Sequence, residues 1–350
     1  MNQGKRIVVI GAGIVGASLA YHLAGKGAKV TVVDAGDVAC GVTATSFAWI
    51  NTTCDAPDPI ASLRSAAIDA YHRLEHELPD VKIRWTGALC YGPNIQPRAN
   101  SRITRERIQA LEPQLKNPPE FAQFKAEEGA LDAVQTTHAL IAAAQALGAR
   151  LLTHNPVLGF SRQGSQVTGV ETSRGVIHAD RVVLAAGTGT AALTSLLGLP
   201  LPIDASPAIF IRYSAPPGIV HTLISNPEME VRESAEGIWL AAEDYLGNAP
   251  EHQPAAIARR TALAIAGELE GVTSIQPQLA CVGLRPIPVD GLPIIGELPS
   301  ANGVYVCVMH PGVTLAAIVG QLVSEEIMES ITSPALAPCR PERFFNPEKS

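Results

Sequence analysis

The sequence predicts an α/β fold built around a parallel sheet, and three observations near the N-terminus predict it. A short run rich in β-branched residues at 7–10 is followed at once by glycines at positions 11, 13 and 16. Good helix formers fill residues 17–23, and a second β-branched run at 30–33 ends in Asp34. Strand, glycine turn, helix and strand in this order form a βαβ unit, whose two strands pair in parallel.

The same residues predict a site for a dinucleotide at the first turn. Gly11 permits a tight turn, Gly13 lets the backbone approach a pyrophosphate, and Gly16 lets the helix pack close to the strand. The free N–H groups and the dipole of the helix N-terminus would hold the pyrophosphate. Asp34 would accept hydrogen bonds from a ribose 2′-OH and disfavours a 2′-phosphate, so the expected cofactor is NAD or FAD rather than NADP. The predicted contacts of this unit are Gly11, Gly13, Ile14, Val15, Gly16, Asp34 and Ala35.

Composition excludes several classes of protein. The 26 basic and 33 acidic residues give a net charge of −7, with no Lys/Arg-dense stretch, so a nucleic-acid partner is not expected. The apolar run at 7–20 contains the three glycines and soon meets Tyr21-His22, so we expect neither a signal peptide nor an integral membrane segment. Six scattered cysteines indicate reduced thiols and a cytoplasmic location.

The remaining elements follow along the chain. An amphipathic helix is expected at 62–78, a strand at 85–91, one short helix within 93–119, and a helix at 138–147 that ends at Gly148. Strands are expected at 150–153, 167–171, 176–178 and 181–184, with further strands between prolines at 199–217. A helix at 255–269, a strand at 304–308 and a helix from about 310 to 328 complete the pattern.

Four longer segments resemble the D-amino acid oxidase (DAO) family of FAD-dependent oxidoreductases. Besides the glycine pattern with Asp34, they read GALDAVQTTHALIAAAQALGARL, ADRVVLAAGTGT, GLRPIPVDGLPIIG and VYVCVMHPGVTLAAIVGQLVSEEI. The resemblance spans most of the chain and implies FAD, held non-covalently. It also implies a discontinuous Rossmann-like FAD-binding domain of the GR2 type (1–84, 141–204 and 281–350). The rest, 85–140 and 205–280, would form an α+β substrate-binding domain with a mostly antiparallel sheet.

The resemblance extends the set of expected cofactor contacts. A backbone group near Val157 would meet the adenine, and Ala186-Gly187 would lie beside the cofactor. Thr45 and Ser46 match a loop that touches the pyrophosphate or the flavin. A helix beginning near residue 310 would direct its N-terminus at the flavin and stabilise negative charge there. The contacts implied in this way are Thr45, Ser46, Val157, Ala186, Gly187, Gly312, Val313 and Thr314.

Two side chains are expected to serve catalysis. Arg285 matches the arginine that holds the substrate carboxylate in the family, and a guanidinium grips a carboxylate with two hydrogen bonds; the alternative is an ordinary salt-bridged arginine. His310 lies where the family has a histidine followed by glycines, and it is equally a structural residue at a strand–helix junction. The strand near residues 229–232 lacks the tyrosine that related oxidases place over the substrate, and Tyr213 or Tyr245 would be its substitutes.

The resemblance implies oxidation of the C–N bond of a small amine-bearing carboxylate. Glycine, sarcosine, a D-amino acid and a cyclic imino acid are all candidate substrates, with O2 or a quinone-linked carrier as electron acceptor. One alternative is a flavin-carrying subunit of a hetero-oligomer that is inactive alone, and another is an NAD-dependent dehydrogenase. A homo- or hetero-oligomer is compatible with the sequence.

Two further patterns favour ordinary explanations. His72-Arg-Leu-Glu-His76 fits the H-x-x-E-H pattern of inverted zinc peptidases, but its charges alternate as on a solvated helix and no third ligand is evident, so no metal is expected. Cys281 lies near the position at which some sarcosine oxidases attach flavin, but it falls short of that position by a couple of residues.

Overall fold

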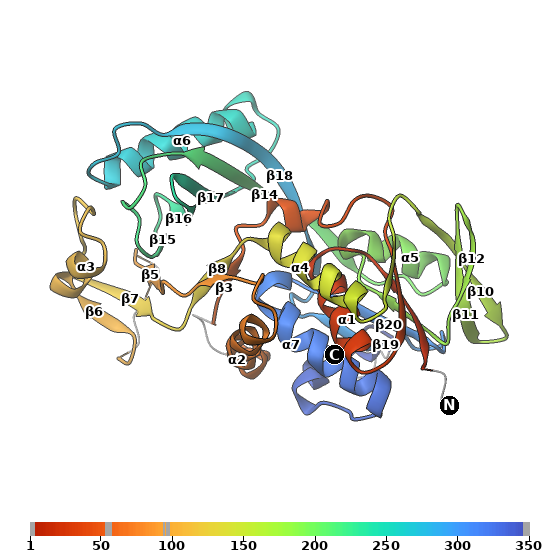
Figure 1. The fold of residues 1–350 in the computed structure, drawn as a ribbon. Coiled ribbons are helices and arrows are strands. Elements are labelled where there is room, and N and C mark those ends of the chain that lie inside the picture. Colours follow the sequence, from red (N-terminus) through yellow and green to blue (C-terminus); the bar gives the residue numbers. More distant parts are fainter. Residues whose placement is uncertain (1–3, 53–57, 94, 96–98, 346–350) are drawn as a thin grey trace.

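A six-stranded sheet organises the half of the computed structural model that contains the N-terminus (Figure 1). The structure describes residues 4–52, 58–93, 95 and 99–345. The strand order is β19–β20–β13–β1–β2–β9, and all neighbouring pairs are parallel except β19–β20. The strands are β1 (Arg6–Ile10), β2 (Lys29–Val33), β9 (Arg150–Leu152), β13 (Arg181–Leu184), β19 (Ile294–Glu297) and β20 (Val304–Val308). Segments from the start, middle and end of the chain therefore meet in one sheet, which confirms the predicted discontinuous Rossmann-like fold.

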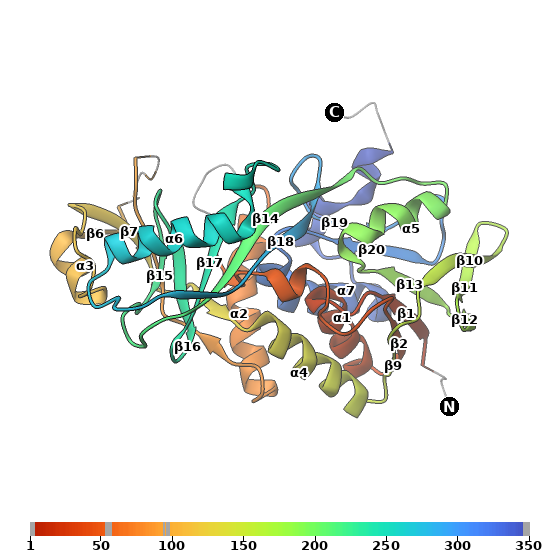
Figure 2. The same cartoon turned by 90° about the horizontal axis from the view of Figure 1, so that it is seen from above.

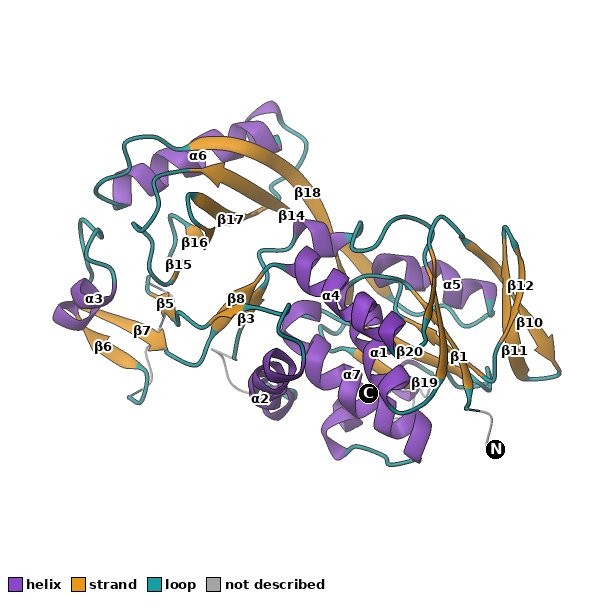
Figure 3. Ribbon diagram, viewed as in Figure 1, coloured by secondary structure: helices purple, strands orange, loops and turns teal. Residues whose placement is uncertain are grey.

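The two faces of this sheet are covered by different layers. Val9 and Val32 point into a core shared with helices α1 (Ile14–Gly25), α4 (Ala133–Ala146) and α7 (Gly312–Glu329), which Figure 3 shows gathered together. Helix α2 (Ala61–Glu77) packs beside α7. Val8 and Ile10 point to the opposite core, which is closed by α5 (Thr190–Leu196) and the antiparallel sheet β10–β11–β12. The strands of that sheet are β10 (Val157–Gln163), β11 (Gln166–Thr172) and β12 (Gly175–His178).

A second large sheet, of eight strands, occupies the other half of the molecule. Its order is β18–β14–β17–β16–β15–β5–β7–β6, and all pairs are antiparallel except β15–β5. The strands are β5 (Ala88–Cys90), β6 (Arg102–Thr104), β7 (Phe121–Lys125), β14 (Ile203–Ser214), β15 (Leu223–Ser225), β16 (Glu230–Ala235), β17 (Ile238–Asp244) and β18 (Gln276–Pro288). Helix α6 (Pro254–Glu268) lies along β14 and β18 (Figure 2), and the shorter α3 (Arg105–Leu111) lies beside β6 and β7.

Alternation along these strands separates a core face from a second face. Ile211, Val231 and Ala241 are buried in a core with Ile257 and Ile265 of α6. Because side chains alternate across a strand, the neighbours of these residues point away from α6. A small sheet, β3 (Trp49–Ile50), β8 (Gly129–Leu131) and β4 (Ile83–Arg84), lies on the path of the chain between the two halves.

The two longest strands connect the halves. β14 and β18 pair along their whole lengths, from Ile203 opposite Pro288 to Ser214 opposite Gln276. Both strands run across the positions, 204/205 and 280/281, at which the sequence analysis divides the chain. The domain boundaries themselves stay a prediction.

Most predicted elements are present, and the differences have local causes. Helix α4 begins at Ala133, five residues before the expected start at 138, because the Asp132 side chain accepts a hydrogen bond from the Gln135 N–H and caps the helix. The expected strand at 85–91 is shorter and preceded by β4. The proline in β14, Pro207, does not interrupt the strand. None of the helices in the described part of the chain is both long and apolar enough to cross a membrane.

Candidate functional site

A cavity of about 730 Å³ lies between the six-stranded and the eight-stranded sheets. It is lined by the residues that follow β1, β2, β13 and β20 and by residues of β14, β16, β17 and β18. The cavity therefore lies at the carboxyl ends of parallel strands, where α/β sheets commonly bind ligands. Its volume is within the range of about 300–1,000 Å³ typical of small-molecule sites.

The turn between β1 and α1 forms one wall of the cavity. Gly11 has a φ of +111°, and a Cβ there would lie 2.3 Å from the Ala185 carbonyl oxygen, so only glycine fits. A Cβ on Gly13 would meet only the Thr43 hydroxyl, at 3.2 Å, and would otherwise project into free space. Gly16 does not line the cavity; its hypothetical Cβ would lie 1.9 Å from the Gly11 oxygen, which fits its predicted role in close packing of helix and strand.

The first turn of α1 offers hydrogen-bond donors to the cavity. Gly13 is the N-cap residue, and no side-chain acceptor caps the helix from that position. Ile14 and Val15 line the cavity, and the Ile14 N–H donates to the Thr43 hydroxyl at 3.2 Å. The remaining N–H groups and the helix dipole suit a bound anion such as a pyrophosphate.

Asp34 lies at the end of β2 and its carboxylate is partly engaged by the backbone. It accepts hydrogen bonds from the Ala12 N–H at 2.6 Å and from the Gly36 N–H at 2.8 Å. A carboxylate has about four acceptor positions, so two such bonds leave capacity for a ribose hydroxyl. Ala35 and Val157 line the same end of the cavity, and the Asn155 N–H donates to the Asp34 carbonyl oxygen.

The loop after β2 lies between the two sheets. Thr45 and Ser46 line the cavity at the end of the short 3₁₀ helix Val42–Thr45. A Cβ on Gly283 of β18 would lie 2.4 Å from the Thr45 Oγ1, so β18 packs directly against this loop. Ala186 and Gly187, which follow β13, line the cavity as well.

The N-terminus of α7 points at the cavity beside the start of α1. Gly312 and Val313 line the cavity, and a Cβ on Gly312 would lie 3.6 Å from a methyl group of Val15. No side chain in the described part of the chain caps α7, so its first N–H groups remain available to a ligand. The Tyr71 hydroxyl of α2 donates to the Val313 carbonyl oxygen and holds this turn in place.

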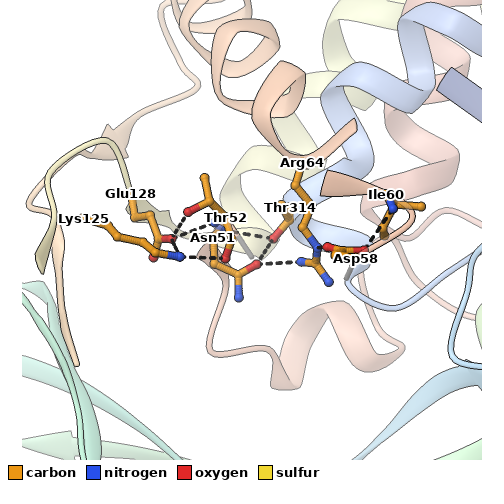
Figure 4. A network of polar contacts seen from close by, with 8 residues as sticks. All are labelled: Asn51, Thr52, Asp58, Ile60, Arg64, Lys125, Glu128 and Thr314. Atoms are coloured by element: carbon orange, nitrogen blue, oxygen red, sulfur yellow. Dashed lines mark hydrogen bonds and ion pairs between the residues drawn. The ribbon is translucent and has the colours of Figure 1, made fainter. Parts of the chain in front are cut away.

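Thr314 does not line the cavity, and it supports the site from behind (Figure 4). It is fully buried, and its hydroxyl lies 3.0 Å from the Trp49 carbonyl oxygen and 3.1 Å from the Asn51 Oδ1. Arg64 of α2 donates to the same Asn51 oxygen at 3.0 Å and pairs with Asp58 at 3.1 Å. These contacts fix Asn51, which lines the cavity, against α2 and α7.

A buried ion pair extends this network toward the small sheet. Glu128 is fully buried and pairs with Lys125 at 3.2 Å. Its two oxygens also accept hydrogen bonds from the Trp49 indole at 2.8 Å and from the Thr52 hydroxyl at 2.6 Å. Since Trp49 also lines the cavity, the pair stabilises the cavity wall next to β3.

Arg285 reaches the cavity from β18, opposite the glycine turn. Its Nη2 donates to the Ser206 hydroxyl at 3.1 Å and to the Pro207 carbonyl oxygen at 3.3 Å. Its Nε is buried and has no hydrogen-bond partner among the described residues. A buried donor without an acceptor is costly, and a ligand carboxylate bound to Nε would satisfy it.

His310 follows β20 and is exposed to the cavity rather than packed into a core. The surrounding protein removes water from the imidazole, and the charges of Arg285 and Arg64 add to this effect, so the pKa of His310 falls to about 4. The imidazole is therefore neutral near pH 7, and among the described residues that line the cavity the cationic side chain is that of Arg285. Met309, just before it, is buried in the helix-side core.

Glu230 is a cavity residue that the sequence analysis did not select. It lies at the start of β16, half-buried in the cavity wall, and its Oε2 accepts a long hydrogen bond of 3.5 Å from the Ser225 hydroxyl. Burial, the main cause, and the negative charges of Glu243 and Asp244 raise the pKa of Glu230 to about 7, whereas Ser225 and Arg285 oppose the rise.

The cavity thus brings together fifteen of the seventeen predicted site residues; Gly16 and Thr314 lie behind its wall. Sequence reasoning missed the wall residues that come from the middle of strands and loops, among them Thr43, Trp49, Asn51, Asn155, Phe210 and Glu230. The selected residues were indicated by the glycine pattern, by the acid after the second strand, or by the segments that resemble the DAO family, and the missed residues carry no such signal.

The residues with ordinary explanations lie elsewhere. Cys281 does not line the cavity, although it belongs to β18. Tyr213 donates to the Ala258 carbonyl oxygen inside the core under α6, and Tyr245 donates to Asn248, so neither contributes to the cavity. His72 stacks on the Trp85 ring with centroids 4.2 Å apart, on the exposed side of α2.

The arrangement suits a long ligand with an anionic centre and a carboxylate beside its far end. Asp34 and Val157 lie at one end, two uncapped helix N-termini lie along the wall, and Arg285 lies opposite. Glycines leave room for close approach where a Cβ would fill the space. These residues fit a dinucleotide that extends from the acidic end of β2 toward Arg285.

Comparison with known proteins gives concordant results. The FAD dependent oxidoreductase (DAO) family matches residues 6–326. Glycine oxidase from Pseudomonas putida is 26% identical, with 97% of this chain and 99% of that protein covered. L-amino acid deaminase from Proteus vulgaris, solved with a deletion of its specific insertion sequence, has a TM-score of 0.86 at 18% identity and covers 97% of this chain and 94% of its own. L-proline dehydrogenase from P. horikoshii has a TM-score of 0.84 at 20% identity, with 99% of each chain covered. The two solved structures, at these identities, support the fold alone.

Proposed function

Because the chain belongs to the FAD dependent oxidoreductase (DAO) family, we propose that it oxidises the C–N bond of a small amino acid, or of an N-substituted or cyclic amino acid. Membership of this family makes the cofactor FAD, and the NAD-dependent alternative is therefore wrong. The product of the reaction is an imine, which water hydrolyses.

The observation that carries this proposal is the position of Arg285. Its guanidinium enters the cavity on the side opposite the glycine turn, and its buried Nε lacks a partner among the described residues. A carboxylate that accepts from this guanidinium is held with a fixed orientation, because the planar donor group matches the two carboxylate oxygens. Fixed orientation places the neighbouring Cα–H toward the interior of the cavity, which favours reaction there.

The residues that would hold FAD are those of the cavity wall. Asp34 and Val157 would contact the adenosine part, and Gly11, Gly13 and the first turn of α1 the pyrophosphate. The N-terminal N–H groups of α7 would contact the flavin, at the end of the cavity next to His310. When bound, FAD supplies the acceptor for the hydride that leaves the substrate. As a member of this family the chain holds FAD non-covalently, and Cys281 does not line the cavity.

Several features of the chain prepare the reaction. Arg285 binds and orients the substrate carboxylate, and the apolar side of the wall, which includes Phe210 and Ala242, excludes water from the reacting bond. His310 is neutral near pH 7 and contributes hydrogen bonding rather than charge. The dipole of α7 stabilises negative charge that develops at its N-terminus.

The proposal includes a class of substrate and two candidate electron acceptors. Glycine, sarcosine, D-amino acids and cyclic imino acids all carry the carboxylate that Arg285 requires and the C–N bond that is oxidised. The similarity to glycine oxidase supports a small substrate. O2 or a quinone-linked carrier would reoxidise the flavin.

The test is the visible spectrum of the purified chain under anaerobic conditions. Glycine, sarcosine, D-alanine, D-proline and hydroxyproline are added in turn, and bleaching of the flavin bands by one of them identifies the substrate class. Admission of air then separates an oxidase from a dehydrogenase. Bleaching by none of them would favour a flavin-carrying subunit that needs a partner, and a protein that takes up no FAD would overturn the proposal.

A further inference from the structure

We propose that Glu230 is the binding partner of the substrate amine and accepts its proton, so that Glu230 and Arg285 together select a zwitterionic amino acid. This inference rests on the proposed function, because it assigns a role in the same site. It goes beyond that function by naming the group that distinguishes an amino acid from other carboxylates.

Glu230 and Arg285 lie on the same face of the eight-stranded sheet. Val231 and Ala241 pair with each other and are buried under α6, so the adjacent Glu230 and Ala242 point to the opposite face. Ala242 pairs with Phe210, and Ser206, four residues along β14, pairs with Arg285. Cross-strand partners lie on one face, so Glu230 and Arg285 both project toward the cavity, and both line it.

Both charged side chains have incomplete sets of contacts. Among the described residues, the Glu230 side chain accepts one hydrogen bond, from the Ser225 hydroxyl at 3.5 Å, which is too long to satisfy a half-buried carboxylate. Arg285 uses Nη2 for Ser206 and Pro207 and retains a buried Nε without a partner among the described residues. Glu230 and Arg285 influence each other electrostatically but do not form a salt bridge, so each is available to a ligand.

The charges of the two side chains match those of a zwitterion. A zwitterion carries one positive and one negative group, and Glu230 and Arg285 offer a carboxylate and a guanidinium within each other's electrostatic influence. A simple carboxylate would leave Glu230 without a cationic partner and would place two negative charges near each other. The site therefore discriminates against carboxylic acids that lack an amine.

After binding, one proton moves from the substrate ammonium to the Glu230 carboxylate. The N–H bond of the substrate ammonium breaks, its electron pair stays on nitrogen, and an O–H bond forms on Glu230. The ammonium and the carboxylate both become neutral, so the net charge of the site is unchanged. A free electron pair on nitrogen is required before the C–N bond can gain double-bond character. The pKa of Glu230 is raised to about 7, so it is closer to the pKa of an amine than that of an ordinary carboxylate is. Proton transfer from the ammonium to Glu230 is therefore less unfavourable.

The experiment compares ligand binding rather than turnover alone. FAD-loaded protein is titrated anaerobically with an amine-bearing carboxylate and with its ether analogue, in which oxygen replaces nitrogen. Suitable pairs are sarcosine with methoxyacetate and D-proline with tetrahydrofuran-2-carboxylate. Binding is read from the change in the flavin absorbance. For an ether analogue, which does not react, this change is measured at equilibrium, and for an amine that reacts it is measured after rapid mixing, before the flavin bands bleach.

For the wild-type protein we expect the amine to bind more tightly than its ether analogue, by about 10- to 100-fold, the range for hydrogen bonds to a charged group. Glu230→Gln should lose most of this preference and leave binding of the ether analogue unchanged or tighter. Glu228→Gln is the matched control: it removes the same charge two residues away, at an exposed position that does not line the cavity. Equal amine preference in Glu230→Gln and wild type would overturn the inference while leaving the proposed function intact.

A second measurement covers the case in which Glu230→Gln fails to fold. The titratable and charged groups around Glu230 are Glu243 and Asp244 of β17 and Arg285 of β18. In wild type, protonation of Glu230 below about pH 7 should weaken amine binding, whereas binding of the ether analogue should not weaken. Parallel pH profiles for the two ligands would overturn the inference. Failure of every amine-bearing ligand to bind the FAD-loaded protein would instead overturn the proposed function itself.

Discussion

At the scale of single residues, binding of a ligand carboxylate in the cavity is expected to depend on Arg285. Its guanidinium is fixed by Ser206 and Pro207, so its free donor points in one direction. Lysine carries the same charge but cannot present two donors in one plane. The contribution of this residue is therefore expected to depend on its geometry as well as on its charge.

Arg285→Lys should raise the KM for the amino-acid substrate about 10- to 100-fold, because the variant loses one charge-assisted hydrogen bond to the carboxylate. The FAD content of the purified protein should stay at the wild-type level, because the contacts proposed for FAD come from other residues. Steady-state kinetics and the ratio of flavin to protein absorbance measure both quantities. Arg212→Lys is the control, since Arg212 is exposed on the adjacent strand β14. An unchanged KM in Arg285→Lys would contradict its assignment to the substrate carboxylate.

Gly13 allows the cofactor cradle to be tested separately from folding. Its φ of −75° is accessible to any residue, and an added Cβ would meet only the Thr43 hydroxyl. Gly13→Ala should therefore fold with a free energy of unfolding close to that of wild type when FAD is absent. Its FAD dissociation constant should increase at least about 10-fold, because the methyl group occupies space needed by the pyrophosphate. Fluorescence titration with FAD measures the change.

Gly25→Ala provides the matched control for Gly13→Ala. Gly25 lies at the other end of α1, and an added Cβ would reach only a Leu147 methyl group at 4.0 Å. Replacement there should leave FAD affinity unchanged and stabilise the helix slightly, by up to about 1 kcal/mol. Equal affinities of the Gly13 and Gly25 variants would indicate that the glycine turn does not contact the cofactor.

Residues selected from the sequence are positioned by segments that are continuous in the chain, whereas residues found only in the structure are positioned by long-range strand pairing. Gly11, Gly13 and Asp34 take their places from a turn and a strand that are continuous in the chain, so local spacing locates them. Glu230 lies far from Arg285 in sequence and reaches the same cavity through the order of strands in a sheet. Strand order depends on long-range pairing, which a single sequence does not specify.

At the scale of elements, the C-terminal segment is attached to α7 by an ionic cluster. Glu326 of α7 accepts hydrogen bonds from Arg340 at 2.9 Å and from the Ser333 N–H at 2.9 Å, and Tyr305 of β20 donates to it as well. Burial alone would raise the pKa of Glu326, but the hydrogen bonds from Arg340 and Tyr305 outweigh burial and bring the pKa below its ordinary value.

The consequence is a stability contribution that depends on pH. Since the pKa of Glu326 is lower in the folded state than in the unfolded state, its contribution is complete above the unfolded pKa of about 4.3 and is lost as pH falls through the folded pKa. Glu326→Gln should lower the free energy of unfolding at pH 7 by about 1–3 kcal/mol. The difference from wild type should shrink as the pH falls below 4.

Urea unfolding of FAD-free protein at pH 7, 5 and 3.5 measures this difference. Glu329→Gln is the control, because Glu329 lies on the same helix as Glu326 and its ion pair, with Lys26 at the end of α1, is exposed and contributes little. A difference between Glu326→Gln and wild type that stays constant with pH would show that the variant acts by disturbed packing rather than by loss of the charge.

Elements with strong local signals were predicted well, and those defined by partners were not. The β1–α1–β2 unit, α6 and α7 agree closely with the expected ranges, because their apolar periodicity and flanking glycines are local. The predicted start of α4, at 138, was wrong, because Asp132 caps the helix and it begins at Ala133. The two-residue strands β3 and β4 exist only because β8 pairs with both, so no sequence run announces them.

At the scale of the whole molecule, the cavity spans two sheets and should need a ligand that reaches both ends. FAD present at 100 times its dissociation constant should stabilise the folded protein by about 2.7 kcal/mol. FMN or AMP, each of which covers only part of the cavity, should stabilise less at the same concentration. Thermal unfolding of FAD-free protein with each compound, and with NAD, measures this order. Stabilisation by NAD equal to that by FAD would contradict the proposed extended flavin site.

The fold class was within reach of the sequence at this scale, but the shape of the substrate pocket was not. The resemblance to the DAO family, which rests on motifs from several parts of the chain, implied the discontinuous parallel sheet. The pocket wall depends on how β14, β16 and β18 bend and pair, and these strands show no motif beyond the segment around Arg285.

The continuous pairing of β14 with β18 has a mechanical consequence. A hinge between the two halves would have to break ladder hydrogen bonds in the middle of the longest strand pair, from Ile203–Pro288 to Ser214–Gln276. The two sheets are therefore expected to move as one stiff body, without the opening and closing of domains that gates many enzymes. Entry of substrate and departure of product then depend on rotations of side chains and small loop displacements around a preformed chamber.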